Sequence, residues 1–170
     1  MSTTLSHEAF VGLVDGHRGI LLKVAAAYCR DANEREDLTQ EIVVQLWRAV
    51  PHFEGRSNFS TWMYRIAVNV AIAFCRSDER KRRNLVPAEA SLLEGIAASA
   101  QTPEDDRLEY LRELIDRLDP LDRALMLFYL DDYSYSEIAS MLGISETNVG
   151  TKIGRIKERF KRTLAAERRP

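Results

Sequence analysis

The sequence has few of the residues that hold metals or cross-link a chain. Among its 170 residues are two cysteines and three histidines. Cys29 and Cys75 lack the close paired spacing of a metal site, and both stand in apolar helical patterns where a buried thiol acts as a small hydrophobic residue. His7, His17 and His52 show no metal-ligand spacing either. We therefore expect no metal site, no cofactor, and cysteines with a structural role.

Long apolar runs are also missing. No stretch approaches the roughly 20 apolar residues that a helix needs to cross a bilayer, and residues 1–10 lack the apolar run behind a basic flank that marks a secretory signal. These absences favour a cytoplasmic protein that does not insert into membranes. The sequence also lacks a phosphate-binding glycine loop, a nucleophile elbow and a cluster of carboxylates. We therefore expect no enzymatic activity.

Charge of either sign is not in large excess, but it is unevenly distributed. The 26 acidic and 24 basic residues give a formal net charge of −2, which disfavours strong DNA binding by the chain alone, because such affinity comes mainly from basic side chains. Basic clusters lie at residues 76–83 and 152–162. Two separate patches suit a protein that touches DNA at two places while a partner supplies affinity. Ordinary solvated surface charge would give a similar composition.

Helical periodicity recurs along the chain without sustained strand-like alternation, and it predicts an all-α fold. Helix starts are indicated after Asn33 and at the Thr102-Pro103 and Asp119-Pro120 pairs. Two groups of apolar residues fall at helical spacing and would each form one stripe: Leu38, Ile42 and Leu46, and then Phe59, Trp62, Met63, Ile66, Val70 and Phe74.

Residues 84–101 contain Pro87, Gly95 and many alanines and serines, without a wide apolar face. They predict a flexible linker between two small helical domains, residues 1–83 and 102–170. A linker of this length could span about 60 Å at about 3.3 Å per residue, so that each domain could reach a different DNA segment. A short helix around residues 91–98 would reduce that reach.

The second domain has a pattern typical of a helix-turn-helix. Ser134 and Glu137 match a capping box, Gly143 suits the left-handed turn between two helices, and Ser145 would cap the second helix. The residues expected to face inward are Ile138, Ala139, Leu142, Ile144, Val149, Ile153 and Ile156. The second helix would then present its first side chains to the major groove of DNA. An ordinary helical hairpin would leave the turn glycine and the basic face unexplained.

Two motifs stand in the first domain. Residues 36–47 read EDLTQEIVVQLW, and residues 52–69 read HFEGRSNFSTWMYRIAVN. Together with the helix-turn-helix, and in the same order, they resemble the conserved core of bacterial RNA polymerase sigma factors of the extracytoplasmic-function (ECF) group, from about residue 8 to residue 165. The resemblance implies a protein that binds RNA polymerase core, melts promoter DNA and directs promoter-specific transcription initiation.

The resemblance also implies roles for residues of the first domain. The polar side of the first motif would dock on the clamp helices of the largest polymerase subunit through Asp37, Gln40 and Glu41. The second motif would recognise and melt the minus-ten element through Ser57, Asn58, Phe59, Thr61, Tyr64, Arg65, Asn69 and Arg76. Holding a flipped base and stacking others offsets the cost of opening DNA. Phe59 and Trp62 could instead be core residues, whereas Tyr64 lies off the apolar stripe and is expected to be exposed.

In the second domain, the helix after Ser145 would read the minus-thirty-five element. The residues that the resemblance selects there are Thr147, Asn148, Thr151, Lys152 and Arg155. The chain departs from the family at Gly150 and Gly154, where a basic and a larger residue are common, and a different promoter preference is expected. Each glycine should cost the helix about 1 kcal/mol relative to alanine. Close approach to DNA or to a neighbouring helix would explain the two glycines. A helix that simply tolerates their destabilising effect would explain them equally well.

Two further expectations concern partners. Members of the family are often held inactive by an anti-sigma factor, and two small domains joined by a linker are easily clamped, which predicts such a partner here. The alternative is a free-standing helix-turn-helix regulator that dimerises through an amphipathic stripe formed by Leu108, Leu111, Ile115 and Leu118. The polymerase-docking face and the melting loop would have no purpose in that protein.

Overall fold

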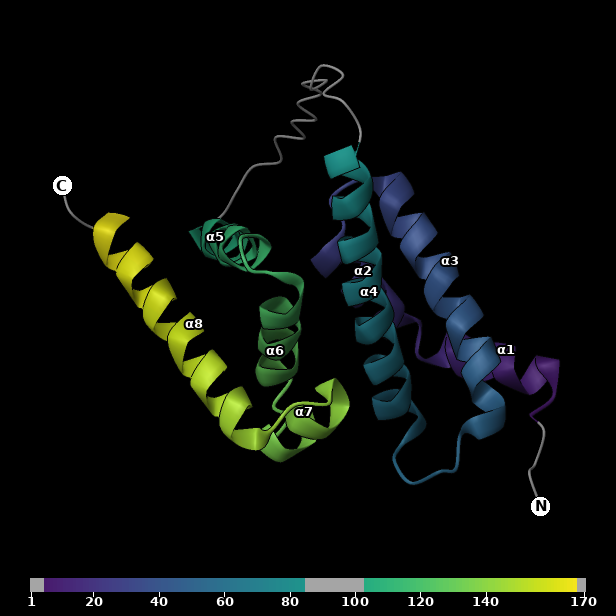
Figure 1. Cartoon of the computed structure of the whole chain (residues 1–170). Coiled ribbons are helices and arrows are strands. Elements are labelled where there is room, and N and C mark those ends of the chain that lie inside the picture. The colour runs from purple at the N-terminus through teal and green to yellow at the C-terminus, as the bar shows by residue number, and fades with distance from the viewer. Residues whose placement is uncertain (1–4, 85–102, 168–170) are drawn as a thin grey trace.

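The computed structural model describes residues 5–84 and 103–167 (Figure 1). These residues form helices and connecting turns without a strand, which confirms the all-α fold. The first domain holds α1 (His7–Gly16), α2 (Arg18–Tyr28), α3 (Ala32–Ala49), the short 3-10 helix η1 (Val50–His52) and α4 (Phe59–Asn84). The second holds α5 (Pro103–Asp116), α6 (Pro120–Leu130), α7 (Tyr135–Leu142) and α8 (Glu146–Glu167). Residues 85–101 of the predicted linker, with the short helix considered there, lie outside the described residues.

Local capping chemistry sets where the helices begin. The Asp31 carboxylate accepts hydrogen bonds from two amides of the first turn of α3, at 2.8 and 3.1 Å. The helix therefore begins at Ala32, and the predicted start after Asn33 is wrong, because the earlier aspartate already satisfies the free amides. Asp119 caps α6 in the same way, with Pro120 at its first position, as predicted.

The central helix of the molecule is α4. It packs against α2 and α3 on one side and against α6 and α7 on the other (Figure 1). Its fully buried residues are therefore Met63, Ala67, Val68 and Ala71, whereas Ile66, Val70 and Phe74 of the predicted stripe are only half-buried. A helix covered on two sides buries a wide arc, which a single stripe at helical spacing does not describe.

One apolar cluster runs through both domains. It joins Leu38 and Ile42 of α3, by way of α4, to Phe128 of α6 and Ile138 of α7. A smaller cluster inside the second domain holds Leu118 together with two residues of α6 and α8. The two domains thus share a continuous core. None of the helices in the described ranges is long and apolar enough to span a membrane.

Candidate polymerase-binding and DNA-binding surfaces

The second domain contains the predicted helix-turn-helix. The amide of Glu137 donates to the Ser134 hydroxyl at 3.2 Å, and the Ser134 amide donates to the Glu137 carboxylate at 2.7 Å. This second bond lowers the pKa of Glu137. Helix α7 ends at Gly143, which has a left-handed φ of 67°, and Ser145 then caps α8 by accepting from the amide of Asn148 at 3.1 Å. Each predicted capping and turn residue therefore acts in its expected place.

The predicted inward side of the motif is also confirmed. Ile138, Val149, Ile153 and Ile156 are buried, and Ala139, Leu142 and Ile144 are half-buried. Most of these residues pack in the cluster that contains Phe128 of α6. Helix α6 therefore supports the crossing of α7 and α8, and it fixes the direction in which α8 presents its outer face.

The residues selected for the minus-thirty-five element lie on the first half of α8. The side chains of Thr147, Asn148, Thr151 and Arg155 are exposed. Lys152 differs, because its ammonium pairs with the carboxylate of Asp122 on α6 at 3.1 Å and its side chain is only 32% exposed. Lys152 is therefore held within its own domain, while the other four side chains face solvent.

The two unusual glycines of α8 have different surroundings. A Cβ at Gly150 would lie 3.4 Å from the ring of Tyr135, which is an ordinary van der Waals contact, and a Cβ at Gly154 would meet nothing within 4 Å. Close helix packing therefore explains neither glycine. An approach to DNA at these positions remains a prediction.

The polar side of α3 carries the residues selected for polymerase docking. Asp37, Gln40 and Glu41 are exposed, and Leu38 and Ile42 on the opposite side are fully buried. A row of acidic and amide groups on a well-anchored helix can meet a basic partner helix with a defined register.

The loop between η1 and α4 carries the first residues selected for the minus-ten element. Ser57 and Asn58 are exposed there, close to Gly55, which has a φ of 69°. Phe59 opens α4 half-buried, with its ring centroid 5.4 Å from that of Trp62. Trp62 is 8% exposed and belongs to the core, so the alternative of core packing is correct for this residue. Phe59 lies at the edge of the same aromatic group.

Along α4, the remaining residues of the minus-ten set have unequal exposure. Arg65, Asn69 and Arg76 are exposed and Thr61 is half-buried. The expectation that Tyr64 is exposed is wrong, because its side chain faces the second domain and is 4% exposed. Burial, together with a hydrogen bond to Asp131, raises the pKa of the Tyr64 hydroxyl well above its ordinary range.

An open groove of about 1020 Å³ connects two of the predicted sets. Asp37 and Glu41 of α3 line it together with Arg65 and Asn69 of α4, and residues 140–143 at the end of α7 are also part of its lining. The amide nitrogen of Asn69 donates to two backbone carbonyls, one on α4 at 2.9 Å and that of Met141 on α7 at 3.3 Å. The groove thus joins the docking face, part of the minus-ten face and the helix-turn-helix.

Sequence reasoning did not identify the residues that join the domains. Asp131 follows α6, and its carboxylate binds Tyr64 and Lys23, which lie 67 and 108 residues earlier in the chain. Arg123 reaches the carbonyl of Ala27, 96 residues earlier. Contacts between residues so far apart in the chain do not affect the local spacing of residue types, so no sequence signal could have indicated them.

Comparison with known proteins gives the family. The model of Sigma-70 region 2 matches residues 13–81, within the first domain, and the model of Sigma-70 region 4 matches residues 108–160, within the second. The ECF RNA polymerase sigma-E factor of Escherichia coli K12 is 32% identical over 148 residues, which cover 80% of this chain and 78% of the relative. This chain belongs to the ECF sigma factors.

Other relatives of this ECF sigma factor agree. The ECF sigma factor SigW of Bacillus subtilis is 28% identical over 169 residues, covering 92% of this chain and 89% of SigW. The fold of the present chain is similar to that of RpoE bound to the anti-sigma factor NepR from Bartonella quintana. The TM-score is 0.67 and the identity 19%, and the match covers 94% of this chain and 98% of RpoE. CnrH, solved with the cytosolic domain of CnrY, gives a TM-score of 0.64 at 22% identity, with coverage of 95% and 90%.

Proposed function

We propose that this ECF sigma factor binds RNA polymerase core and directs it to a specific set of promoters. The observation that carries the proposal is the exposed polar side of α3, together with the exposed loop before α4, in a chain whose second domain contains a helix-turn-helix. Residues 1–83 would bind core and open the minus-ten element, and residues 102–170 would read the minus-thirty-five element. Residues 84–101 would connect the two.

Polymerase docking is assigned to Asp37, Gln40 and Glu41. Their side chains are exposed along one side of α3, which is held in place by the fully buried Leu38 and Ile42. An acidic face steers association with a basic partner surface and fixes its register. The net charge of −2 is consistent with a protein that depends on core for much of its affinity for DNA.

Opening of the minus-ten element is assigned to the loop and to α4. Ser57 and Asn58 would border a pocket for a flipped base, with the ring of Phe59 as one wall. Residues further along α4 would contact the same DNA: Thr61, Tyr64, Arg65, Asn69 and Arg76. The amide of Asn69 suits hydrogen bonds to base edges, and the guanidinium of Arg76 suits phosphates.

Reading of the minus-thirty-five element is assigned to α8. Thr147, Asn148 and Thr151 are exposed near its amino-terminal end, where a recognition helix meets base edges in the major groove. Arg155 and Lys152 would contact phosphates. The pairing of Lys152 with Asp122 supports a smaller contribution from this lysine than from Arg155.

The proposal also covers where the protein acts in the cell and how its activity is regulated. The protein would act in the cytoplasm without an enzymatic activity of its own, because the polymerase supplies the chemistry. An anti-sigma factor would hold it inactive, a proposal supported by the fold that it shares with RpoE in the complex with the anti-sigma factor NepR.

A free-standing regulator is the less favoured function. The stripe that would form its dimer interface is largely covered by other residues of the same chain. Leu118 is buried against Met126 and Ile156, and of the four leucine and isoleucine residues in the stripe only Leu108 is strongly exposed. Gel filtration with purified core separates the two functions. A sigma factor elutes with core in the absence of DNA, whereas a regulator elutes alone.

A further inference from the structure

We propose that a cavity between α2, α3, α5 and α6 binds a small anion with two or more linked phosphate groups, such as a nucleoside oligophosphate or an inorganic oligophosphate. This inference goes beyond the proposed function and does not depend on it. The cavity has a suitable size, basic side chains are in excess around it, and the donors of its arginines are only partly used.

The cavity has a volume of about 590 Å³ and is formed by both domains. The first domain supplies part of α2, the turn after it and the first part of α3, and the second domain supplies parts of α5 and α6. Cavities that bind small molecules usually have volumes of about 300–1,000 Å³. This one is therefore large enough for a nucleotide.

Basic side chains outnumber acidic ones around the cavity. The charged residues that line it are Lys23, Arg30, Arg35, Arg112, Glu109 and Asp116. Asp131 and Arg123 lie close by, since they bind Lys23 and Ala27 of the lining, and their charges cancel each other. Positive charge is thus in excess here, although the whole chain has a formal net charge of −2. Such a concentration of cations attracts an anion.

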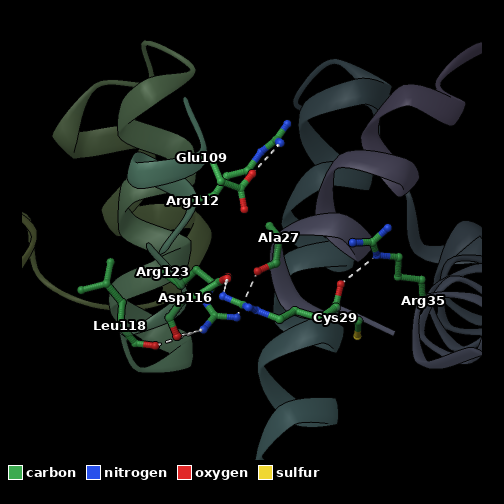
Figure 2. A network of polar contacts seen from close by, with 9 residues as sticks. Ala27, Cys29, Arg35, Glu109, Arg112, Asp116, Leu118 and Arg123 are labelled. Carbon is green, nitrogen blue, oxygen red and sulfur yellow. Dashed lines mark hydrogen bonds and ion pairs between the residues drawn. The ribbon is translucent and has the colours of Figure 1, made fainter. Parts of the chain in front are cut away.

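Two arginines neutralise the carbonyl end of α2 beside the cavity (Figure 2). Arg123 of α6 donates to the carbonyl of Ala27 at 3.0 Å, and Nε of Arg35 donates to the carbonyl of Cys29 at 2.8 Å. The carbonyl end of a helix carries a partial negative charge, which would otherwise repel an anion. The two hydrogen bonds offset that repulsion.

The arginines of α3 and α5 keep most of their hydrogen-bonding capacity. Among the described residues, Arg35 donates only through Nε, so both of its terminal nitrogens remain for a ligand. Arg112 contacts Glu109 through one nitrogen at 3.4 Å, and its side chain is 74% exposed. Figure 2 shows Arg35 and Arg112 on opposite sides of Ala27. Because a guanidinium matches two oxygens of one phosphate, each arginine would bind a different phosphate group of the ligand.

The other two cations have carboxylate partners that a phosphate would replace. Arg30 pairs with Asp116 through one terminal nitrogen, and its side chain is 77% exposed. Lys23 pairs with Asp131, and its side chain is 45% exposed. Ion pairs as exposed as these contribute little to stability, because water solvates both charges. Several linked phosphates carry more negative charge than one carboxylate, so a single ligand would attract all four cations.

An apolar part of the lining separates the two kinds of ligand. Ala26 and Ala27 of α2 and Ile115 and Leu127 of the second domain also line the cavity. The base of a nucleotide would bury apolar surface against these residues, whereas an inorganic oligophosphate has no apolar surface to bury. A nucleoside oligophosphate should therefore bind more tightly than an inorganic chain with the same number of phosphates.

The test is titration calorimetry of the full chain with ATP and with inorganic triphosphate, at about 0.15 M salt to screen charges outside the cavity. The site variants are Arg30→Gln and Arg112→Gln, both at exposed positions. Arg18→Gln on α2 and Arg107→Gln on α5 remove the same charge from exposed positions outside the lining, and they are the matched controls. Each site variant should bind about tenfold more weakly than wild type, and the controls should bind as wild type does. Circular dichroism checks that all the chains are folded.

Wild type that binds neither probe would overturn the proposal. Site variants with wild-type affinity would also overturn it, and so would equal losses in the site variants and the controls, which indicate attraction to surface charge in general. Tighter binding of ATP supports the site and identifies nucleoside oligophosphates as its ligands, whereas equal binding of both probes supports a site for the phosphate chain alone. The titrations contain neither polymerase nor DNA, so their result is independent of the proposed function.

Discussion

The hydroxyl of Tyr64 donates a 2.8 Å hydrogen bond to the carboxylate of Asp131, across the boundary between the two domains. The tyrosine belongs to the motif assigned to promoter DNA, and the aspartate belongs to the turn that leads into the helix-turn-helix. The contact therefore buries, between the domains, a residue that we propose binds promoter DNA.

Removing that hydroxyl should destabilise the free chain. Tyr64→Phe keeps the ring against Phe128 but deletes a bond to a charged acceptor, so the free energy of unfolding should fall by about 1.5–3 kcal/mol. Tyr135→Phe, at an exposed position, is the matched control and should change it by less than about 0.5 kcal/mol. Urea denaturation measures both. Equal stability of Tyr64→Phe and wild type would show that the contact does not hold the domains together.

Charge reversal on α3 should weaken core binding without unfolding the chain. We expect Asp37→Lys combined with Glu41→Lys to raise the Kd for core at least about tenfold, or about 1.4 kcal/mol, because the acidic face would repel a basic partner. Glu8→Lys combined with Asp15→Lys makes the same change of charge on exposed positions of α1. Fluorescence titration with core compares the two. Equal affinities would remove α3 as the docking face.

On α8, Arg155→Ala should reduce transcription from promoters that depend on the minus-thirty-five element more than Lys152→Ala does. Arg155 is exposed, whereas Lys152 is paired with Asp122. Loss of one phosphate contact should lower the slope of log affinity against log salt by about 0.9. Binding of reconstituted holoenzyme to promoter fragments at several salt concentrations measures it. A larger effect of Lys152→Ala would mean that the ion pair breaks on DNA.

Alanine should have opposite effects at two glycines of the helix-turn-helix. Gly154→Ala should raise the free energy of unfolding by about 1 kcal/mol, because the added methyl group meets nothing within 4 Å. Gly143→Ala should lower it by about 1 kcal/mol or more, because φ is 67° there. Thermal unfolding measures both. If Gly154→Ala stabilises the chain but weakens promoter binding, the glycine serves close approach to DNA.

Alkaline pH should destabilise the chain partly through Cys29. Burial raises the pKa of this thiol from 9.0 to about 11, so the unfolded chain loses the proton first. The contribution of the protonated Cys29 thiol to the free energy of unfolding is therefore complete below pH 9 and is lost as the pH rises to about 11. Cys29→Ala should give a shallower fall of stability across this window, measured by urea denaturation at each pH. Identical slopes for both chains would contradict the burial of an un-ionised thiol.

Local chemistry made much of this molecule predictable from sequence. The capping box at Ser134, the turn at Gly143 and the start of α6 at Asp119 each depend on a few neighbouring residues, and each was predicted correctly. The start of α3 was misplaced because two capping residues, Asp31 and Asn33, compete within one short segment. The family followed from motif order, and the comparisons confirm it.

Relations between distant parts of the chain could not be predicted in this way. Tyr64 lies off the stripe that packs on α3, so helical spacing indicated an exposed side chain, and only the packing of α6 against α4 buries it. The pairing of Lys152 with Asp122 likewise depends on how α8 crosses α6. The roles of the polymerase-binding and promoter-binding residues remain predictions, because the structure places these side chains and does not contain their partners.

The most direct test of the central claim is transcription in vitro with purified core polymerase on a genomic DNA library, with start sites mapped in the presence and absence of this chain. We predict a set of start sites that occurs only when the chain is present, each preceded by shared sequence elements near minus ten and minus thirty-five. The same start sites with and without the chain would contradict the claim that it is the factor that selects them.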